Sequence, residues 1–338
     1  MELIMHVPDG SYHIYLETGI LSRVLDFVSN PEVLILTDEG VPAQYYQSIQ
    51  KQIQASLLII PQGEHSKSLF QYGQVLHACA KFQLSRKALI LALGGGVVGD
   101  LAGFVAATYL RGIDYIQIPT TTLAQIDSSI GGKTAINLGE TKNQVGAFYH
   151  PKAVLIDPLT LRTLDQRNYA AGLVEAVKAG VIGDAGLFSR FEQPISFDQI
   201  PEILYSALLV KQKIVEVDPK EQHLRKILNY GHTYGHALES AGGLSGYYHG
   251  EAVFLGMLLM SEEPLYQRLL KIGENLGLPL KTDLPLNSLL PYLKADKKAH
   301  ENGIDMVLVK DLGEALIEHW SMEKVIAKLE ENYGRIHQ

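Results

Sequence analysis

The stretch Ala88-Leu-Ile-Leu-Ala-Leu93 is fully apolar and runs directly into Gly94-Gly-Gly-Val-Val-Gly99-Asp100. A short apolar run that ends in glycines is typical of a strand buried on both faces, as in a parallel sheet covered by helices. Comparable runs alternate with helical patterns at Val33–Thr37, Leu57–Ile60 and Tyr115–Ile118. The sequence therefore predicts an α/β fold whose N-terminal part is a doubly wound, Rossmann-like sheet. Tyr12–Leu16 is predicted to form a short edge strand.

The second half has a different pattern, because helical segments follow one another past about Asp157 and few strand candidates occur before Met306–Val309. A chain of 338 residues also exceeds the usual size of a single hydrophobic core. We therefore expect a Rossmann-like domain over residues 1–157 and a mainly α-helical domain over residues 158–338. Ligands of open α/β sheets bind at the carboxyl ends of the strands, so we expect the site there, in the cleft between the halves.

The composition indicates a globular protein of the cytoplasm. The formal net charge of −8 disfavours a nucleic-acid partner, so any anionic substrate must be held by a local cluster of Lys and Arg side chains. The single cysteine, Cys79, lies in an apolar helical pattern and is expected to be a structural thiol in a reducing compartment. No stretch reaches the ~18 apolar residues of a membrane span, and no signal-peptide pattern opens the chain.

The glycine motif Gly94-x-Gly96-x-x-Gly99 follows a predicted strand and opens a helix, which is the context of a dinucleotide-binding turn. Glycines let the backbone approach a pyrophosphate, and the helix N-terminus attracts it. A tight turn that binds nothing is the alternative, and Asp100 is an unusual neighbour for a phosphate. The acid that would bind the ribose is either Asp38 or Asp114, since spacing does not choose between them. Thr120-Thr-Thr122 offers further hydroxyls, although helix capping would explain one of them.

A second glycine pair precedes a lysine at Gly131-Gly132-Lys133. An ammonium in such a turn can bind an anion, and a solvated lysine is the alternative. Gly132-Lys133-Thr134 matches the end of a Walker loop, but Asp127 stands where that motif needs its first glycine, so a Walker loop is excluded.

Three histidines indicate a metal site in the second half. His232 and His236 are one helical turn apart and face the same way, and His249 follows after a Gly-rich connection. A catalytic zinc typically takes three protein ligands and keeps one position open. The residue after His232 is not Glu, which excludes a HExxH metalloprotease. Packed or surface histidines are the alternative.

Charged residues occur where helical packing would favour apolar ones. Glu175 and Lys178 lie three residues apart on an apolar helix, and Glu221 and Arg225 lie four apart before the histidine helix. Surface ion pairs would explain each pair alone. Together with Lys211, they would supply a carboxylate for a divalent metal and several cations for an anionic substrate.

The chain resembles the 3-dehydroquinate synthase family of sugar phosphate cyclases over nearly its whole length. The motifs that carry the resemblance are Pro61–Lys67, Gly94–Gly112, Pro119–Thr134, Gly172–Gly180, Leu228–Ala237, His249–Glu251 and Asp296–Lys298. Family members usually carry a glycine at the position of His223, and the segment after Lys298 lacks a basic residue often found there.

The resemblance implies specific roles. The metal ligands, for Zn²⁺ or Co²⁺, are Glu175, His232 and His249, so that His236 contacts the substrate instead. The NAD-binding residues are Asp38, Glu64, Lys67, Gly95, Gly96, Asp100, Thr120, Thr121 and Lys142. The catalytic and substrate-binding residues are Asp127, Lys133, Asn143, Lys178, Lys211, Glu221, Arg225, Asn229, His236 and a lysine of the pair Lys297 and Lys298. Arg111 is implied to reach the site of a neighbouring subunit, in a homodimer.

The implied reaction converts 3-deoxy-D-arabino-heptulosonate 7-phosphate to 3-dehydroquinate and phosphate in the shikimate pathway. It proceeds through transient oxidation by NAD, elimination of phosphate, re-reduction and intramolecular aldol closure. Two alternatives remain, a different sugar phosphate cyclase of the same fold and a metal-dependent alcohol dehydrogenase. Lys211 and Arg225 favour an acidic substrate and hence the first reading.

Overall fold

A computed structural model describes residues 1–8, 10–139, 141–243, 246–297 and 303–337. The chain divides into two units, Met1–Asp165 and Gln166–Gln338. None of the described helices is both long enough and apolar enough to cross a membrane.

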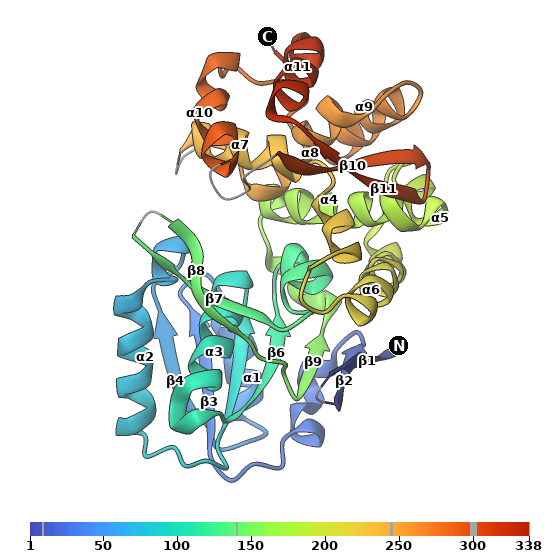
Figure 1. Cartoon of the computed structure of the whole chain (residues 1–338). Helices are drawn as coiled ribbons and strands as arrows, with labels where there is room; N and C mark the ends of the chain where they lie inside the picture. Colours follow the sequence, from blue (N-terminus) through green and yellow to red (C-terminus); the bar gives the residue numbers. More distant parts are fainter. Residues whose placement is uncertain (9, 140, 244–245, 298–302, 338) are drawn as a thin grey trace. The chain divides into compact units, whose positions relative to one another are not determined.

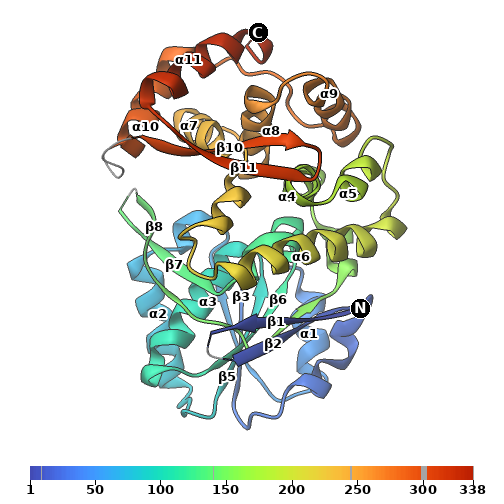
Figure 2. The same ribbon diagram turned by 45° about the vertical axis from the view of Figure 1, so that its right-hand side comes forward.

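A seven-stranded sheet organises the first unit (Figure 1). In spatial order its strands are β1 (Glu2–Val7), β2 (Gly10–Leu16), β9 (Ala153–Ile156), β6 (Asp114–Pro119), β5 (Leu89–Gly94), β3 (Val33–Asp38) and β4 (Ser56–Ile60). The pairing of β1 with β2 is antiparallel, and the other neighbouring pairs are parallel. The predicted doubly wound sheet is thereby confirmed. The predicted strand at Tyr12–Leu16 is confirmed as β2, but its predicted position at the edge of the sheet is wrong, because β1 pairs with β2 and takes the edge (Figure 2).

Helices cover both faces of this sheet. Leu89, Leu91 and Leu93 of β5 pack with η1 (Ile20–Phe27) and α1 (Ala43–Gln50). The alternate residues, Ile90 and Ala92, pack with α2 (Leu69–Lys81) and α3 (Gly96–Thr108). Successive residues of a strand point to opposite faces, so a strand with two covered faces must be apolar throughout. Cys79 is fully buried in the second of these cores, and burial raises the pKa of its thiol to about 11, as expected for a structural cysteine.

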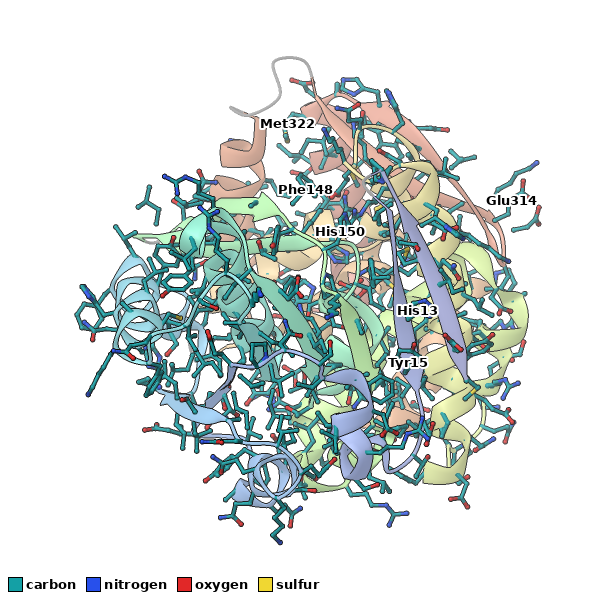
Figure 3. The ribbon with its side chains drawn as sticks, turned by 90° about the horizontal axis from the view of Figure 1, so that it is seen from below. His13, Tyr15, Phe148, His150, Glu314 and Met322 are labelled. Carbon is teal, nitrogen blue, oxygen red and sulfur yellow. The ribbon has the colours of Figure 1, made fainter. Side chains whose placement is uncertain are left out.

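Shorter elements complete the first unit. They are η2 (Glu64–Ser66), η3 (Tyr109–Arg111), the π-helical turn η4 (Ala124–Ser128), the hairpin β7 (Lys133–Leu138) and β8 (Thr141–Phe148), and η5 (Pro158–Thr163). Lys133 begins β7 directly after the predicted glycine turn, in which Gly131 and Gly132 have positive φ. On β2, the rings of His13 and Tyr15 stack with centroids 5.6 Å apart, since alternate residues of a strand share a face (Figure 3).

The second unit is mainly helical, as predicted. Its elements are α4 (Gln166–Gly183), α5 (Ala185–Arg190), η6 (Phe197–Gln199), α6 (Ile200–Val217), η7 (Leu224–Asn229), α7 (His232–Gly242), α8 (His249–Met260), α9 (Leu265–Leu276), α10 (Leu286–Lys297), the hairpin β10 (Ile304–Asp311) and β11 (Glu314–Trp320), α11 (Met322–Asn332) and η8 (Tyr333–Arg335). Every residue of α8 from Gly250 to Met260 is buried, which is typical of a helix at the centre of a core. The histidine His249 begins this helix.

Candidate functional site

Glu175 lies on the buried helix α4 with only 2% of its surface exposed, and Lys178, one turn further on, is 3% exposed. A surface ion pair is therefore the wrong interpretation of these two residues. One carboxylate oxygen of Glu175, Oε2, is paired with Lys178 Nζ. The other, Oε1, has no hydrogen-bond partner among the described residues. A buried carboxylate oxygen without a partner is costly unless a cation or a donor completes it.

Two imidazoles face that oxygen. The Nε2 atoms of His232 and His249 lie 3.9 Å and 3.8 Å from Glu175 Oε1. Their Nδ1 atoms are engaged elsewhere, with the Tyr230 carbonyl at 3.2 Å and with Glu239 Oε2 at 3.1 Å. A carbonyl and a carboxylate can only accept, so Nδ1 donates in both cases, and in the neutral ring each Nε2 presents a lone pair toward Glu175. The three ligand atoms lie within 4.8 Å of one another, and the donor set of one carboxylate and two imidazoles fits a zinc-like ion.

Close packing of α4 and α8 explains this convergence. A Cβ atom at Gly250 would lie 1.8 Å from the carbonyl oxygen of Ala171, so only glycine lets the start of α8 approach α4. Arg167, in the first turn of α4, donates from Nε and Nη2 to the two carboxylate oxygens of Glu251, each at 2.7 Å. Both contacts hold the first turn of α8 against α4, and His249 therefore lies close to Glu175.

The two imidazoles have different proton affinities. Burial, followed by the charge of Lys178, holds the pKa of His232 well below its usual range, so this ring is neutral and able to bind a metal near neutral pH. Burial also lowers the pKa of His249, but the hydrogen bond to Glu239 and the charge of Glu175 outweigh it and leave the pKa raised.

His236 lies beside both rings without joining the group that could hold an ion. Its ring centroid is 5.3 Å from that of His232 and 5.8 Å from that of His249. Helix spacing alone pairs His232 with His236, whereas the geometry completes the group with His249.

Three buried cations lie on elements that pack against one another in the second unit. Lys178 on α4, Lys211 on α6 and Arg225 on η7 are at most 6% exposed, and these three elements pack against one another. Lysine and arginine are the side chains that bind carboxylates and phosphates, so these three residues are candidates for contacts with an anionic ligand.

The loop before η7 is built around a carboxylate. Asp218 accepts backbone hydrogen bonds from Gln222, His223 and Arg225 at 3.0, 2.6 and 3.0 Å. Burial raises the pKa of the Asp218 carboxyl, but the three donors outweigh it and leave the pKa lowered. Glu221 lies within this loop and has positive φ, so it and Arg225 are not one helical turn apart, as their spacing had suggested.

Two predicted substrate residues are oriented by this loop. The Glu221 carboxylate accepts a hydrogen bond from Asn229 Nδ2 at 2.9 Å, and Arg225 donates from Nη1 to the Pro219 carbonyl at 2.7 Å. Their orientation is therefore fixed within the second unit.

In the first unit, predicted cofactor residues follow the carboxyl ends of four adjacent parallel strands, β6, β5, β3 and β4. These residues are Asp38, which ends β3, Glu64 and Lys67 after β4, Gly95 and Gly96 after β5, and Thr120 and Thr121 after β6. Carboxyl ends of parallel strands share one edge of a sheet, where ligands of such folds bind. Asp114 begins β6 and so lies at the opposite edge, about 17 Å away along the strand. The geometry thus favours Asp38 over Asp114.

The glycine loop is tightly packed at this edge. Gly95 caps α3, and a Cβ at Gly95 would come within 3.1 Å of Thr121. The Thr120 N–H donates to the Gly94 carbonyl at 3.0 Å, and Thr121 Oγ1 accepts from the Ala124 N–H at 3.2 Å, the capping role expected for one of the threonines.

A polar network joins residues predicted for the cofactor and for the substrate. The buried Lys67 ammonium donates to Asp100 Oδ2 at 2.6 Å and to Asn143 Oδ1 at 2.5 Å. Burial raises the pKa of Asp100, and Lys67 acts in the opposite direction. The Asn137 amide donates to Glu64 Oε1 at 2.8 Å, and its Oδ1 accepts from the Asn143 N–H at 2.9 Å.

The remaining predicted residues are dispersed over both units. Asp127 lies on η4, Lys133 begins β7, and Lys142 is exposed on β8. Lys297 is the last residue of α10, and Lys298 lies outside the described residues. Arg111 lies beyond the C-terminal end of α3, about 20 Å from the glycine loop that starts this helix.

Backbone conformation also distinguishes several of these residues. Among the described residues, five that are not glycine have positive φ: Gln83, Leu110, Arg111, Asn143 and Glu221. The last three are predicted site residues. Such conformations cost on the order of 1 kcal/mol each and tend to persist at functional sites.

Comparison with known proteins shows the family of this chain. Residues 57–171 match the family described as 3-dehydroquinate synthase N-terminal, and residues 172–299 match 3-dehydroquinate synthase C-terminal. The chain belongs to the 3-dehydroquinate synthase family. It is 38% identical to the 3-dehydroquinate synthase of Thermoanaerobacter pseudethanolicus, covering 97% of this chain and 99% of the relative. It is 40% identical to that of Clostridium acetobutylicum, covering 99% of each chain.

Solved structures of sugar phosphate cyclases share the fold of this 3-dehydroquinate synthase family member. A 2-deoxy-scyllo-inosose synthase complexed with carbaglucose-6-phosphate, NAD⁺ and Co²⁺ has a TM-score of 0.88 at 25% identity, over 98% of this chain and 99% of that one. A 2-epi-5-epi-valiolone synthase from Streptomyces hygroscopicus with NAD⁺ and Zn²⁺ bound has a TM-score of 0.86 at 26% identity, with the same coverage.

The structure adds residues that sequence reasoning missed. Glu239 orients His249, Asp218 shapes the loop of Glu221, and Asn137 bridges Glu64 to β8. Glu239 could have been found, because it lies seven residues after His232 on the same helix and therefore on the same face. Asn137 and Glu64 are 73 residues apart, so no local pattern connects them.

Proposed function

We propose that this chain is a 3-dehydroquinate synthase, a carbon–oxygen lyase that converts 3-deoxy-D-arabino-heptulosonate 7-phosphate to 3-dehydroquinate and phosphate. The observation that carries the proposal is the buried Glu175 oxygen that faces two imidazole nitrogens, in a chain 38–40% identical over nearly its whole length to proteins of that name.

Glu175, His232 and His249 would hold a Zn²⁺ or Co²⁺ ion, and the loop after β5 would hold NAD. When bound, the ion would acidify a substrate hydroxyl, and NAD would accept a hydride from that carbon and later return it. Lys178 is paired with Glu175 Oε2, which leaves Oε1 to face the two imidazoles and the proposed ion. Glu239 and the Tyr230 carbonyl keep both imidazoles turned with Nε2 toward Glu175.

The proposed NAD site uses the carboxyl edge of the sheet. Gly95 and Gly96 let a pyrophosphate approach the N-terminus of α3, where the helix dipole favours negative charge. Asp38, at the end of β3, is positioned to accept hydrogen bonds from a ribose. Lys67 neutralises Asp100, which makes a carboxylate tolerable beside a pyrophosphate.

The anionic groups of the substrate would be held by cations. Lys178, Lys211 and Arg225 are buried in the second unit, so they are desolvated and act strongly on a bound carboxylate or phosphate. Such positioning can supply several kcal/mol of barrier reduction, since the substrate must hold one pose through successive steps. Lys133, Asn143, Asn229 and His236 are proposed to complete the substrate contacts.

We also propose that the enzyme is a cytoplasmic homodimer. Arg111 lies about 20 Å from the glycine loop of its own chain, at the far end of α3. This distance supports a role for Arg111 in the site of a neighbouring subunit.

A different sugar phosphate cyclase is the second candidate, favoured by the TM-scores of 0.88 and 0.86 to the inosose and valiolone synthases. Sequence identity to these proteins is 25–26%, against 38–40% to 3-dehydroquinate synthases. The buried cations Lys211 and Arg225 suit an acidic substrate, which also favours the first candidate. Likeness to glycerol and butanol dehydrogenases, at 12–15% identity, shows the fold alone.

The deciding experiment measures phosphate release and absorbance of NADH together. With NAD, zinc and the heptulosonate phosphate, we expect stoichiometric phosphate without net NADH. Chelation should abolish release, and added Zn²⁺ or Co²⁺ should restore it. Net NADH would identify a dehydrogenase, and release only from a non-acidic sugar phosphate would identify another cyclase.

A further inference from the structure

Asn137 stands where the β7–β8 hairpin loses its regular register. Pairing shifts between Ile136 and Leu138, so Asn137 falls outside the regular ladder with β8. Its N–H donates instead to the Lys67 carbonyl at 2.7 Å, and Asn137 forms an isolated parallel bridge with Ser68. The backbone of Asn137 is therefore tied to the segment that carries Glu64 and Lys67, which comes from elsewhere in the chain.

The side chain of Asn137 uses both ends of its amide. Nδ2 donates to Glu64 Oε1 at 2.8 Å, and Oδ1 accepts from the Asn143 N–H at 2.9 Å. Asn143 has φ of +57°, a conformation that a non-glycine residue keeps only when surrounding contacts hold it. Lys67 Nζ then binds Asn143 Oδ1 and closes the ring of contacts. One amide thus fixes a carboxylate on one side and a strained backbone on the other.

We propose that Asn137 is a positioning residue that sets Glu64 and Asn143 in one geometry and thereby couples NAD binding to substrate binding. The inference rests on the proposed function, in which Glu64 contacts NAD and Asn143 contacts the substrate. Asn137 acts through these two residues and touches neither ligand. The Asn137 amide serves both, since its Nδ2 donates to Glu64 and its Oδ1 accepts from the Asn143 N–H.

A double-mutant cycle tests the Glu64 arm. Asn137→Asp keeps an acceptor for Asn143 but places a second carboxylate against Glu64, so the dissociation constant of NAD should rise about tenfold or more. In the Glu64→Gln background the same change should cost little, because the Gln amide donates to the new carboxylate. Asn30→Asp is a matched control, since the Asn30 amide lies 3.3 Å from the Asp114 carboxylate at the opposite edge of the sheet, and NAD affinity should not change.

The Asn143 arm is tested by steady-state kinetics. Asn137→Ala removes both contacts and should raise the substrate KM as well as the NAD dissociation constant, whereas Asn137→Asp should leave the substrate KM within about twofold at saturating NAD. Thermal unfolding of each variant checks that the fold is kept. A merely structural Asn137 would lower the melting temperature without this split between ligands.

The outcomes separate the two proposals. Calorimetric titration of the wild-type protein that detects no NAD binding would remove the NAD-dependent function itself. If the wild-type protein binds NAD and turns over, but Asn137→Asp and Glu64→Gln change the NAD dissociation constant by independent factors, the role of Asn137 alone would be overturned. An Asn137→Asp variant with wild-type NAD affinity would do the same.

Discussion

Replacing Gly250 with alanine should move His249 away from Glu175 and so disrupt the proposed metal site, although every proposed ligand remains in the sequence. Gly250 is the second residue of α8, directly after His249. Its added Cβ would lie 1.8 Å from the Ala171 carbonyl oxygen and 2.6 Å from the carbonyl carbon. These are backbone atoms of α4, which cannot turn away as a flexible side chain would.

The size of the effect follows from these distances. Ordinary van der Waals contact begins at 3.4 Å, so the start of α8 must retreat by about 1.5 Å from α4. Zinc–ligand distances tolerate deviations of only about 0.2 Å. His249 and Glu175 would then be too far apart to bind one zinc ion, and we expect zinc affinity to fall at least about a hundredfold. Overpacking should also lower the free energy of unfolding by about 1–3 kcal/mol.

The assay is zinc competition against a chromophoric chelator, with circular dichroism and thermal unfolding on the same samples. Gly73→Ala is the matched control, because Gly73 lies inside α2 and its Cβ would meet no atom within 4 Å. This control should keep wild-type zinc affinity and gain about 0.5–1 kcal/mol of stability. A folded Gly250→Ala protein with wild-type zinc affinity would refute the reasoning that α4 and α8 must touch for the site to form.

Three further outcomes are expected. Glu239→Ala should weaken zinc binding by about 10–100-fold in the same competition assay, because His249 Nδ1 loses its acceptor, and unaltered affinity would show that Glu239 does not orient the ring. Asp218→Asn should lower the free energy of unfolding at pH 7 by about 1–3 kcal/mol. The pKa of Asp218 is lowered in the folded state, so its stabilisation is complete above the unfolded pKa of about 3.9 and is lost as the pH falls below that value. Denaturant titrations should therefore show the unfolding free energies of the variant and the wild type converging below that pH. A difference that stays constant with pH would contradict this account. Finally, mixing inactive Arg111→Ala with inactive Lys133→Ala protein should restore part of the activity, since mixed dimers would contain one intact site. No recovery despite demonstrated subunit exchange would count against a shared site.

Much of the fold could be predicted because its signal is local. The apolar runs that became β3, β4, β5 and β6 need no partner to be recognised, since burial on both faces requires apolar residues throughout. The hairpin of β7 and β8 was not predicted, because β8 (Thr141–Phe148) is polar and largely exposed over its first four residues. Strand β1 was missed as well, since its buried residues alternate with exposed ones over only six positions.

For the candidate site, too, only the features with a local signal could be predicted from the sequence. Helix spacing places His236 beside His232, yet it says nothing of His249, which belongs to another helix and is brought in by the approach of α8 to α4. His249 and Glu175 were candidates from the residues alone, and the family resemblance selected them as ligands in place of His236; the structure brings both close to His232. Local pattern also could not show that Lys178 is buried, because an ion pair spaced by three residues looks the same on a surface and in a core.

Helix α4 carries the residues that contact α8 and those of the proposed site on one stripe, with Arg167, Ala171, Glu175 and Lys178 following one another at intervals of four, four and three residues. A single residue inserted between Ala171 and Glu175 would rotate the remainder of the helix by about 100°. Composition and hydrophobicity would scarcely change, yet the acid and the ammonium would turn away from the histidines together. The proposed site thus depends on the length of this segment as much as on the identity of its residues. Insertions of the kind that surface loops tolerate would disrupt it.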